Sequence, residues 1–241
     1  MEQTLIAALV LGLLLGMRHA LDPDHVVAVS TIVSDTRNPL RAFWVGTSWG
    51  LGHTTTLLIM GLFIIGLRLA IPERLALFFE FSVGIVLVLL GIQVLLRYRS
   101  RRVHVHAHAH IEEPHRHFHS HGDSVAHVET HHRVSVGRPF VRGKSYLVGT
   151  VHGLAGSAAL MLLVLTTIKT PLAGLLYIVL FGLGSVASMG VLTILIGLPF
   201  VLSAGRFPGM NSRIQLATGC LSILFGLVLM YQIGIVGGLF A

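Results

Sequence analysis

Long apolar runs limit the folds open to this chain more than any other feature. Of its 241 residues, 54% are hydrophobic and only 11% are charged, and the mean hydropathy is +0.81. A bilayer core takes about 20 residues of apolar helix, and it offers backbone groups no water, so such runs must be helical. Six runs are long enough, at about 4–33, 43–66, 75–96, 146–168, 172–202 and 214–236. We therefore predict an all-α, polytopic integral protein of the plasma membrane, surrounded by the lipid bilayer.

The hydrophilic segment 97–145 separates two sets of three predicted spans, 1–96 and 146–241. If the spans alternate in direction, thirteen Lys and Arg residues fall on one side of the membrane and three on the other. The positive-inside rule then places the central segment in the cytoplasm and both termini outside. Topology accounts for the basic residues, so we expect no nucleic-acid partner.

Short glycine motifs recur in the same order in the two halves of the chain. The matches are 16–21 with 149–154, 50–53 with 182–185, and the pair Gly84 and Gly91 with the pair Gly219 and Gly226. With three spans each, the two halves would enter the membrane in opposite directions. The pattern therefore predicts two inverted three-helix repeats, which is a recurrent design among transporters.

An ionisable run, Arg-His-Ala-Leu-Asp-Pro-Asp-His, interrupts the first apolar stretch. Imidazole and carboxylate groups suit nickel, cobalt, copper or zinc, and ionisable groups at membrane depth usually mark a substrate path. We predict a metal site with His19, Asp22, Asp24 and His25 as ligands, and on an ideal helix all of these but Asp24 share one face. Pro23 removes a backbone donor, so we expect the span to break there. The alternative is a short, solvated loop between two helices.

The same run, residues 18–25, resembles the signature of the nickel/cobalt transporter family, and Leu-Gly-His-Thr-Thr at 51–55 is similar to that family's second motif. In so short a chain, the first motif most resembles the urease-accessory nickel permease branch. The resemblance implies a permease for nickel, and secondarily cobalt, that supplies a nickel enzyme such as urease. It implies no enzymatic activity and no cofactor, with the divalent ion as substrate and cytoplasmic nickel chaperones as partners.

Two other functions stay open at this point. A permease of this kind could export nickel or cobalt for metal resistance, although the resemblance favours uptake. An intramembrane metalloenzyme, in which the metal activates a water molecule, is the second alternative. No general base is evident outside the metal cluster, which weighs against it.

Two further histidines lie in apolar runs. His53 follows a pair of glycines that allow another helix to approach closely, which favours a metal ligand over a histidine bonded to a helix carbonyl. His152 matches His19 in the repeat and is equally compatible with a ligand and with a core residue. Larger members of the family carry acidic motifs in the second half, whereas residues 152–157 here read His-Gly-Leu-Ala-Gly-Ser.

Three other side chains receive simpler interpretations. Arg18 is expected to pair with Asp22, one turn along the helix. Trp49 is expected to anchor its helix at the membrane interface. Glu80 falls near the end of a span and is given no role.

Histidines crowd the central hydrophilic segment, which holds eleven of the fifteen in the chain. They are His104, His106, His108, His110, His115, His117, His119, His121, His127, His131 and His132. Tracts of this kind bind transition metals through neutral imidazoles. We predict an auxiliary metal-binding loop that is disordered without metal, because its composition cannot form a core. A merely polar linker is the alternative.

Overall fold

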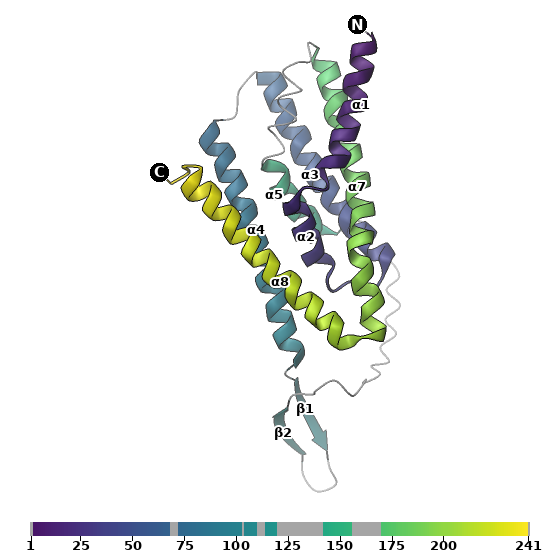
Figure 1. The fold of residues 1–241 in the computed structure, drawn as a ribbon, viewed down its shortest axis with the longest axis vertical. Helices are drawn as coiled ribbons and strands as arrows, with labels where there is room; N and C mark the ends of the chain where they lie inside the picture. Colours follow the sequence, from purple (N-terminus) through teal and green to yellow (C-terminus); the bar gives the residue numbers. More distant parts are fainter. Residues whose placement is uncertain are drawn as a thin grey trace.

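The computed structural model describes residues 2–67, 72–102, 104–109, 114–119, 142–155 and 170–240. Those residues form seven α-helices, one π-helical turn and one β-hairpin (Figure 1). In chain order the elements are α1 (Glu2–His19), α2 (Pro23–Val33), α3 (Pro39–Leu67), α4 (Glu73–Arg102), β1 (His104–Ala109), β2 (Pro114–His119), α5 (Gly143–Leu154), α7 (Pro171–Arg206), α8 (Pro208–Tyr231) and η1 (Gln232–Val236). The body of the molecule is helical, as predicted, and the hairpin lies at one end of it.

In the part of the chain that the structure describes, three helices are long and apolar enough to cross a membrane, and a bent pair of helices is a fourth candidate span. The three are Glu73–Arg99, Pro171–Ala204 and Gly209–Val236, and the bent pair is Ile6–His19 with Pro23–Val33. Many large apolar side chains on these helices are exposed, as expected of surfaces that contact lipid. The count of six spans goes beyond these four and stays a prediction. Much of one expected span, residues 156–169, lies outside the described residues.

The first span breaks at the place that Pro23 predicts. α1 ends at His19 and α2 begins at Pro23, with 53° between them. Pro23 has no N–H to offer the His19 carbonyl, and the N–H of Asp22 donates to that carbonyl instead, at 3.1 Å. Beyond the break, α2 continues away from the N-terminus (Figure 1). The irregular residues 20–22 therefore separate the two halves of the broken span, with Ala20 buried and Leu21 exposed.

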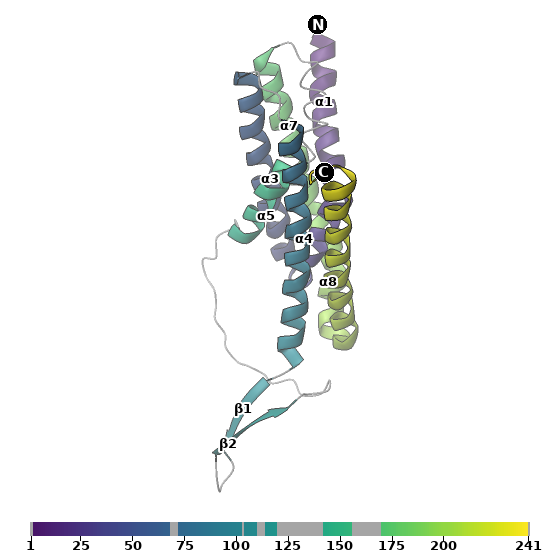
Figure 2. The same cartoon turned by 90° about the vertical axis from the view of Figure 1, so that its left-hand side faces the viewer.

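Part of the His-rich segment is ordered, which corrects the expectation of disorder. β1 and β2 pair antiparallel, with His104 opposite His119, His106 opposite His117 and His108 opposite His115. The period of two in the His-x-His tracts suits an extended strand, and this explains why two such tracts pair. The hairpin lies beyond the end of α4 (Figures 1 and 2). The remaining histidines of the segment, which are His110, His121, His127, His131 and His132, lie outside the described residues.

Close contacts between helices occur at glycines that correspond between the two halves. Gly16 of α1 lies against the Phe181 carbonyl of α7, and Gly149 of α5 lies against the Trp49 carbonyl of α3. A Cβ atom at either glycine would overlap the facing backbone. Gly16 matches Gly149 in the sequence comparison of the halves, and Trp49 and Phe181 each precede the matched Gly-Leu-Gly. In the first contact a glycine of the first half meets the second half, and in the second contact the matching glycine of the second half meets the first half.

α4 and α8 cross at the remaining matched glycines. A Cβ atom on Gly84 would lie 3.0 Å from the Gly226 carbonyl oxygen, and one on Gly91 would lie 2.6 Å from the Gly219 carbonyl oxygen. The helices come this close because no side chain separates them there. α4 runs from the end that holds the N-terminus toward the hairpin, and α8 runs back (Figure 1).

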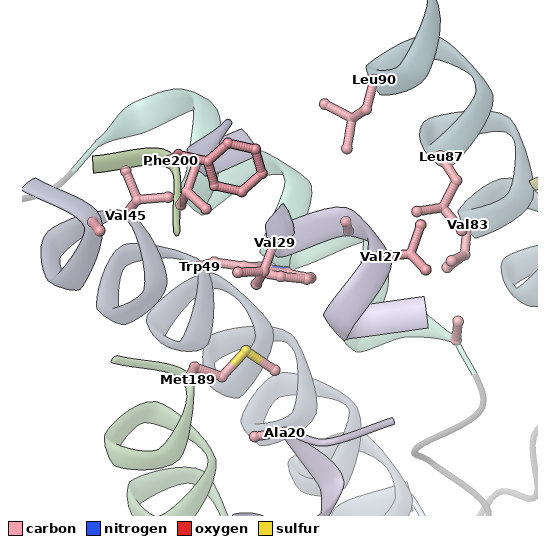
Figure 3. Packing of buried hydrophobic residues seen from close by; sticks show 14 residues of the cluster. Ala20, Val27, Val29, Val45, Trp49, Val83, Leu87, Leu90, Met189 and Phe200 are labelled. Carbon is pink, nitrogen blue, oxygen red and sulfur yellow. The ribbon is translucent and has the colours of Figure 1, made fainter. Parts of the chain in front are cut away.

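α2 is enclosed by four other helices, and its packing holds the broken span in place. It contacts α3, α4, α7 and α8, and Val27 and Val29 are buried in the apolar cluster of Figure 3. Val83 and Leu87 of α4 belong to the same cluster. Close packing of this kind resists small displacements, so the residues on either side of the break are held in one geometry.

Candidate metal site

Four histidines from four helices meet in the interior of the bundle. His19 ends α1, His25 lies in the first turn of α2, His53 lies within α3, and His152 lies near the end of α5. All four are buried. The ring centroids of His19 and His25 are 4.6 Å apart, those of His19 and His53 are 5.0 Å apart, and those of His25 and His152 are 5.5 Å apart. The structure thus gathers the four histidines of the apolar runs into one cluster.

Three of the four rings are close enough to share an ion. His19, His25 and His53 each offer a ring nitrogen within 4.8 Å of the other two, and Nε2 of His19 lies 3.1 Å from Nε2 of His53. Imidazole nitrogens bind a transition-metal ion at about 2.1 Å, so two of them on one ion lie roughly 3.0 Å apart at a right angle and roughly 3.4 Å apart in a tetrahedron. The observed spacing fits two ligands of the same ion.

Each aspartate of the ionisable run orients one histidine. Asp22 Oδ2 lies 2.7 Å from His19 Nδ1, within ion-pair distance, and Asp24 Oδ1 accepts a hydrogen bond from His25 Nδ1 at 3.0 Å. An ionised carboxylate can only accept, so Nδ1 of each ring must carry a proton. In the neutral ring Nε2 then carries the lone pair that a metal requires. Carboxylate–histidine pairs of this kind are the usual outer shell of metal sites.

His152 is oriented by its own helix. Its Nδ1 donates to the Val148 carbonyl oxygen at 3.1 Å, which again leaves the lone pair on Nε2. Within the described residues, three buried nitrogens of the cluster have no hydrogen-bond partner: Nε2 of His25, Nδ1 of His53 and Nε2 of His152. Each unsatisfied buried polar atom costs about 1–3 kcal/mol. Nε2 of His25 and Nε2 of His152 thus carry lone pairs that are open to a ligand, and His53 makes no described bond to a helix carbonyl.

The two aspartates depart from the sequence expectation in their directions. Asp24 points toward the histidines, because Pro23 starts a new helix and the geometry of a continuous helix does not apply. Asp22 pairs with His19, whereas Arg18 is exposed. Asp22 also occupies the N-cap position of α2 without capping it through its side chain. A capping hydrogen bond would stabilise the helix by about 1 kcal/mol. The Asp22 carboxylate pairs with His19 and does not make that bond.

A cavity of about 300 Å³ adjoins the cluster, between α2, α4 and α8. Val83, Phe225 and Leu229 form an apolar part of its wall, and Glu80 of α4 adds a carboxyl group to the polar part. Glu80 was given no role from the sequence. The available signal was an acidic residue seven positions into an apolar helix, since such groups are costly at membrane depth and are usually functional.

Trp49 belongs to the site and not to the membrane interface, so the expectation of an interfacial anchor is wrong. Its side chain is fully buried in the core of Figure 3. Its ring stacks on His25 with centroids 5.4 Å apart and meets His152 edge-on at 5.1 Å. Because Gly149 leaves room against Trp49, the indole can lie between α3 and α5 and fix both imidazoles.

No family model matches the chain, and no solved structure matches it. The chain is 42% identical to the urease accessory protein UreH of Bacillus sp. (strain TB-90) over 238 residues, which cover 98% of this chain and 96% of the relative. This chain belongs to the UreH family of urease accessory proteins. UreH-like proteins are the branch of the nickel/cobalt transporter family that the motifs at 18–25 and 51–55 resemble, so that prediction is confirmed. The UreH relative is a urease accessory protein, in agreement with the expectation that this chain is not itself an enzyme.

A more distant relative of this UreH-like chain is the chloroplast protein FOR GROWTH AND FERTILITY 2 of Arabidopsis thaliana. The two are 26% identical over 221 residues, which cover 90% of this chain and 54% of the relative. This chain thus spans about half the length of the plant protein. The match takes in both sets of predicted spans, so the plant protein contains a region similar to nearly the whole of this chain.

Proposed function

We propose that this UreH-family chain carries nickel ions, and secondarily cobalt ions, across the plasma membrane into the cytoplasm and supplies a nickel enzyme such as urease. The observation that carries the proposal is the buried histidine cluster, in which Nε2 of His19 lies 3.1 Å from Nε2 of His53 and in which Nε2 of His25 and Nε2 of His152 have no described partner. A site of oriented imidazoles suits nickel or cobalt. The relative UreH is a urease accessory protein, which favours delivery of a metal over its removal.

In this proposal His19, His25 and His53 bind the ion, and His152 lies beside them as a fourth ligand. Asp22 and Asp24 hold the rings and contribute two negative charges next to an ion with two positive charges. The loaded site is then close to neutral. This lowers the free energy of holding a divalent ion at membrane depth, where an uncompensated charge is costly.

The ion reaches the cluster through the adjoining cavity, where Glu80 provides a negative charge ahead of the histidines. A carboxylate on such a path raises the local concentration of cations. The remaining wall between α4 and α8 is largely apolar, so it offers the ion no competing ligand. Glu80 thus attracts the ion, and the histidines select it.

We also propose that segments 1–96 and 146–241 are inverted repeats whose relative movement exposes the site to each face of the membrane in turn. The exchanged glycine contacts support this, because Gly16 on Phe181 and Gly149 on Trp49 are counterparts. The antiparallel course of α4 and α8 supports it as well. In the cluster His152 is the counterpart of His19, so both repeats contribute to the site.

The central segment 97–145 is proposed to lie in the cytoplasm and to act as an auxiliary metal-binding loop. Its basic residues favour that side of the membrane, and its histidines can bind several ions weakly. Metal held there would pass to cytoplasmic nickel chaperones. The segment would then buffer the imported ion without forming part of the path.

Accumulation of radioactive nickel in cells with and without the chain tests the function and its direction. We expect higher accumulation with the unaltered chain, loss of the increase with His25→Ala, and retention with His117→Ala, the same substitution outside the cluster. Lower accumulation with the chain would establish efflux in place of uptake. Unchanged accumulation at verified membrane levels would refute nickel transport.

A further inference from the structure

A second cavity, of about 380 Å³, lies between the α2–α3 turn, the last part of α4 and the start of α5. Arg41, Arg97, Arg142 and Lys144 line it, together with a single described carboxylate, that of Asp35. These basic residues come from three separate stretches of the chain, so the fold gathers them around one space. None of them belongs to the histidine cluster.

Asp35 offsets only part of this positive charge. Arg97 Nη1 lies 2.8 Å from Asp35 Oδ2, while Lys144 donates to the amide oxygen of Gln93, which is neutral. Burial lowers the pKa of the Lys144 ammonium and the charge of Arg97 lowers it further, against an opposite effect of Asp35. Crowding of like charges has this effect on a pKa. The cavity therefore keeps an excess of positive charge.

The start of α5 adds backbone donors to the same space. Arg142 occupies the N-cap position, but its side chain does not cap the helix. Gly143, Lys144 and Ser145 form the first turn and line the cavity. The N–H groups of a first turn have no partner within the helix and favour anions. An anion in the cavity would meet both charged side chains and backbone donors.

We propose that this cavity binds the phosphate group of an anionic phospholipid. Its charge repels the divalent cation that the histidine cluster suits, so it is not a second station for the transported ion. Basic pockets between membrane helices recognise lipid headgroups. Leu40, next to Arg41, and Leu147, one turn from Lys144, are 63% and 65% exposed and give acyl chains an apolar surface. Free phosphate would gain nothing from these leucines, which favours the lipid as the source of the phosphate group.

Native mass spectrometry of the purified protein tests the site with three probes at equal concentration: dioleoyl phosphatidylglycerol, dioleoyl phosphatidylcholine and inorganic phosphate. The cavity variant is Arg41→Gln/Arg142→Gln/Lys144→Gln. The control variant, Arg37→Gln/Arg99→Gln/Arg213→Gln, removes the same number of charges from exposed residues that do not line the cavity. Arg97 is left in place because it pairs with Asp35.

The unaltered protein and the control variant should prefer phosphatidylglycerol to phosphatidylcholine by about tenfold, and the cavity variant should lose that preference. Equal binding of the two lipids by the unaltered protein would overturn the proposal, whether or not the variant folds. A preference that survives in the cavity variant would overturn the location. Inorganic phosphate that displaces phosphatidylglycerol at equal concentration would overturn the assignment to a lipid.

Discussion

The chain contains two groups of histidines that differ in burial and in their positions along the sequence. His19, His25, His53 and His152 are buried, come from four helices and lie against one another. The eleven histidines of residues 104–132 occupy one hydrophilic segment of the sequence, and six of them fall in the strands of the described hairpin. Tertiary packing brings the first group together, whereas the second group is close together because it repeats along one segment of the sequence.

The surroundings of each group determine which histidines can be replaced. Inside the bundle each ring nitrogen without a partner costs free energy, so few rings can be kept there, and each has a fixed direction. In a hydrophilic segment water satisfies any ring that binds no metal, so one imidazole can take the place of another. We therefore expect substitutions in the first group to act singly and those in the second group to act only when many are made together.

The largest expected effect is that of His19→Ala or His25→Ala on saturable nickel uptake. Each substitution removes a ring nitrogen from a cluster whose other members cannot move into its place, because their Nδ1 atoms or helices hold them. Uptake should fall to the background of cells without the chain. The measurement is the initial rate of uptake over a range of nickel concentrations, normalised to the amount of protein in the membrane.

Near-normal uptake by either variant would contradict this expectation, since a buried histidine would then be as replaceable as one in the central segment. His152→Ala tests the fourth member of the cluster. If His152 is a ligand, the variant should lose uptake like the others. If it only packs against Trp49, at 5.1 Å, the rate should fall without a change in the nickel concentration that gives half the maximal rate.

Asp22→Asn and Asp24→Asn should weaken nickel binding without abolishing it. Asparagine keeps an acceptor oxygen for His19 or His25 but loses the charge that offsets the ion. Loss of such an outer-shell carboxylate typically lowers metal affinity by about 10–100-fold. The half-saturating nickel concentration for uptake should rise accordingly, whereas Asp35→Asn, a matched change at the Arg97 ion pair, should leave it unchanged. A similar shift in all three variants would show a general effect of charge.

Much of the helical body was predictable because lipid imposes simple rules. Long apolar runs had to be helices, and Pro23 had to interrupt the first of them because it lacks the N–H that a helix needs. The hairpin was harder to foresee. A composition that cannot build a core indicates disorder, yet the period of two in the His-x-His tracts was the competing signal and indicates strands.

The site was predicted most directly where its residues are close in the sequence, although the glycines beside His53 and the repeat match of His152 also made those two histidines candidates. His19, Asp22 and His25 lie within one motif, so their proximity follows from local geometry. His152 and Trp49 reach the cluster through the packing of α5 on α3 at Gly149, which spacing along the chain does not encode. Trp49 was misplaced for this reason, since an aromatic residue in an apolar run is compatible with both an interface and a core.

A smaller effect is expected from Pro23→Ala. The alanine restores a backbone donor and allows α1 and α2 to approach one straight helix, which would turn Asp24 away from His25. Uptake should fall several-fold while thermal stability stays the same or rises, because proline is unfavourable within a continuous helix. Pro39→Ala is the control, since Pro39 also begins a helix but lies outside the cluster. Wild-type rate and affinity in Pro23→Ala would mean that the break does not shape the site.

The smallest expected effect comes from the largest change, replacement of residues 104–132 by a Gly/Ser linker of equal length. This removes eleven histidines, whereas the buried cluster is built from α1, α2, α3 and α5 and keeps its ring contacts and both aspartates. Uptake at high nickel concentration should therefore stay near that of the unaltered chain, and the difference should appear as weaker retention of nickel after external metal is withdrawn. The matched comparison is His19→Ala with the natural segment intact, which should show no uptake to retain. Complete loss of uptake in the linker variant, at normal membrane levels, would show that the segment is part of the path and that the two groups of histidines act as one site.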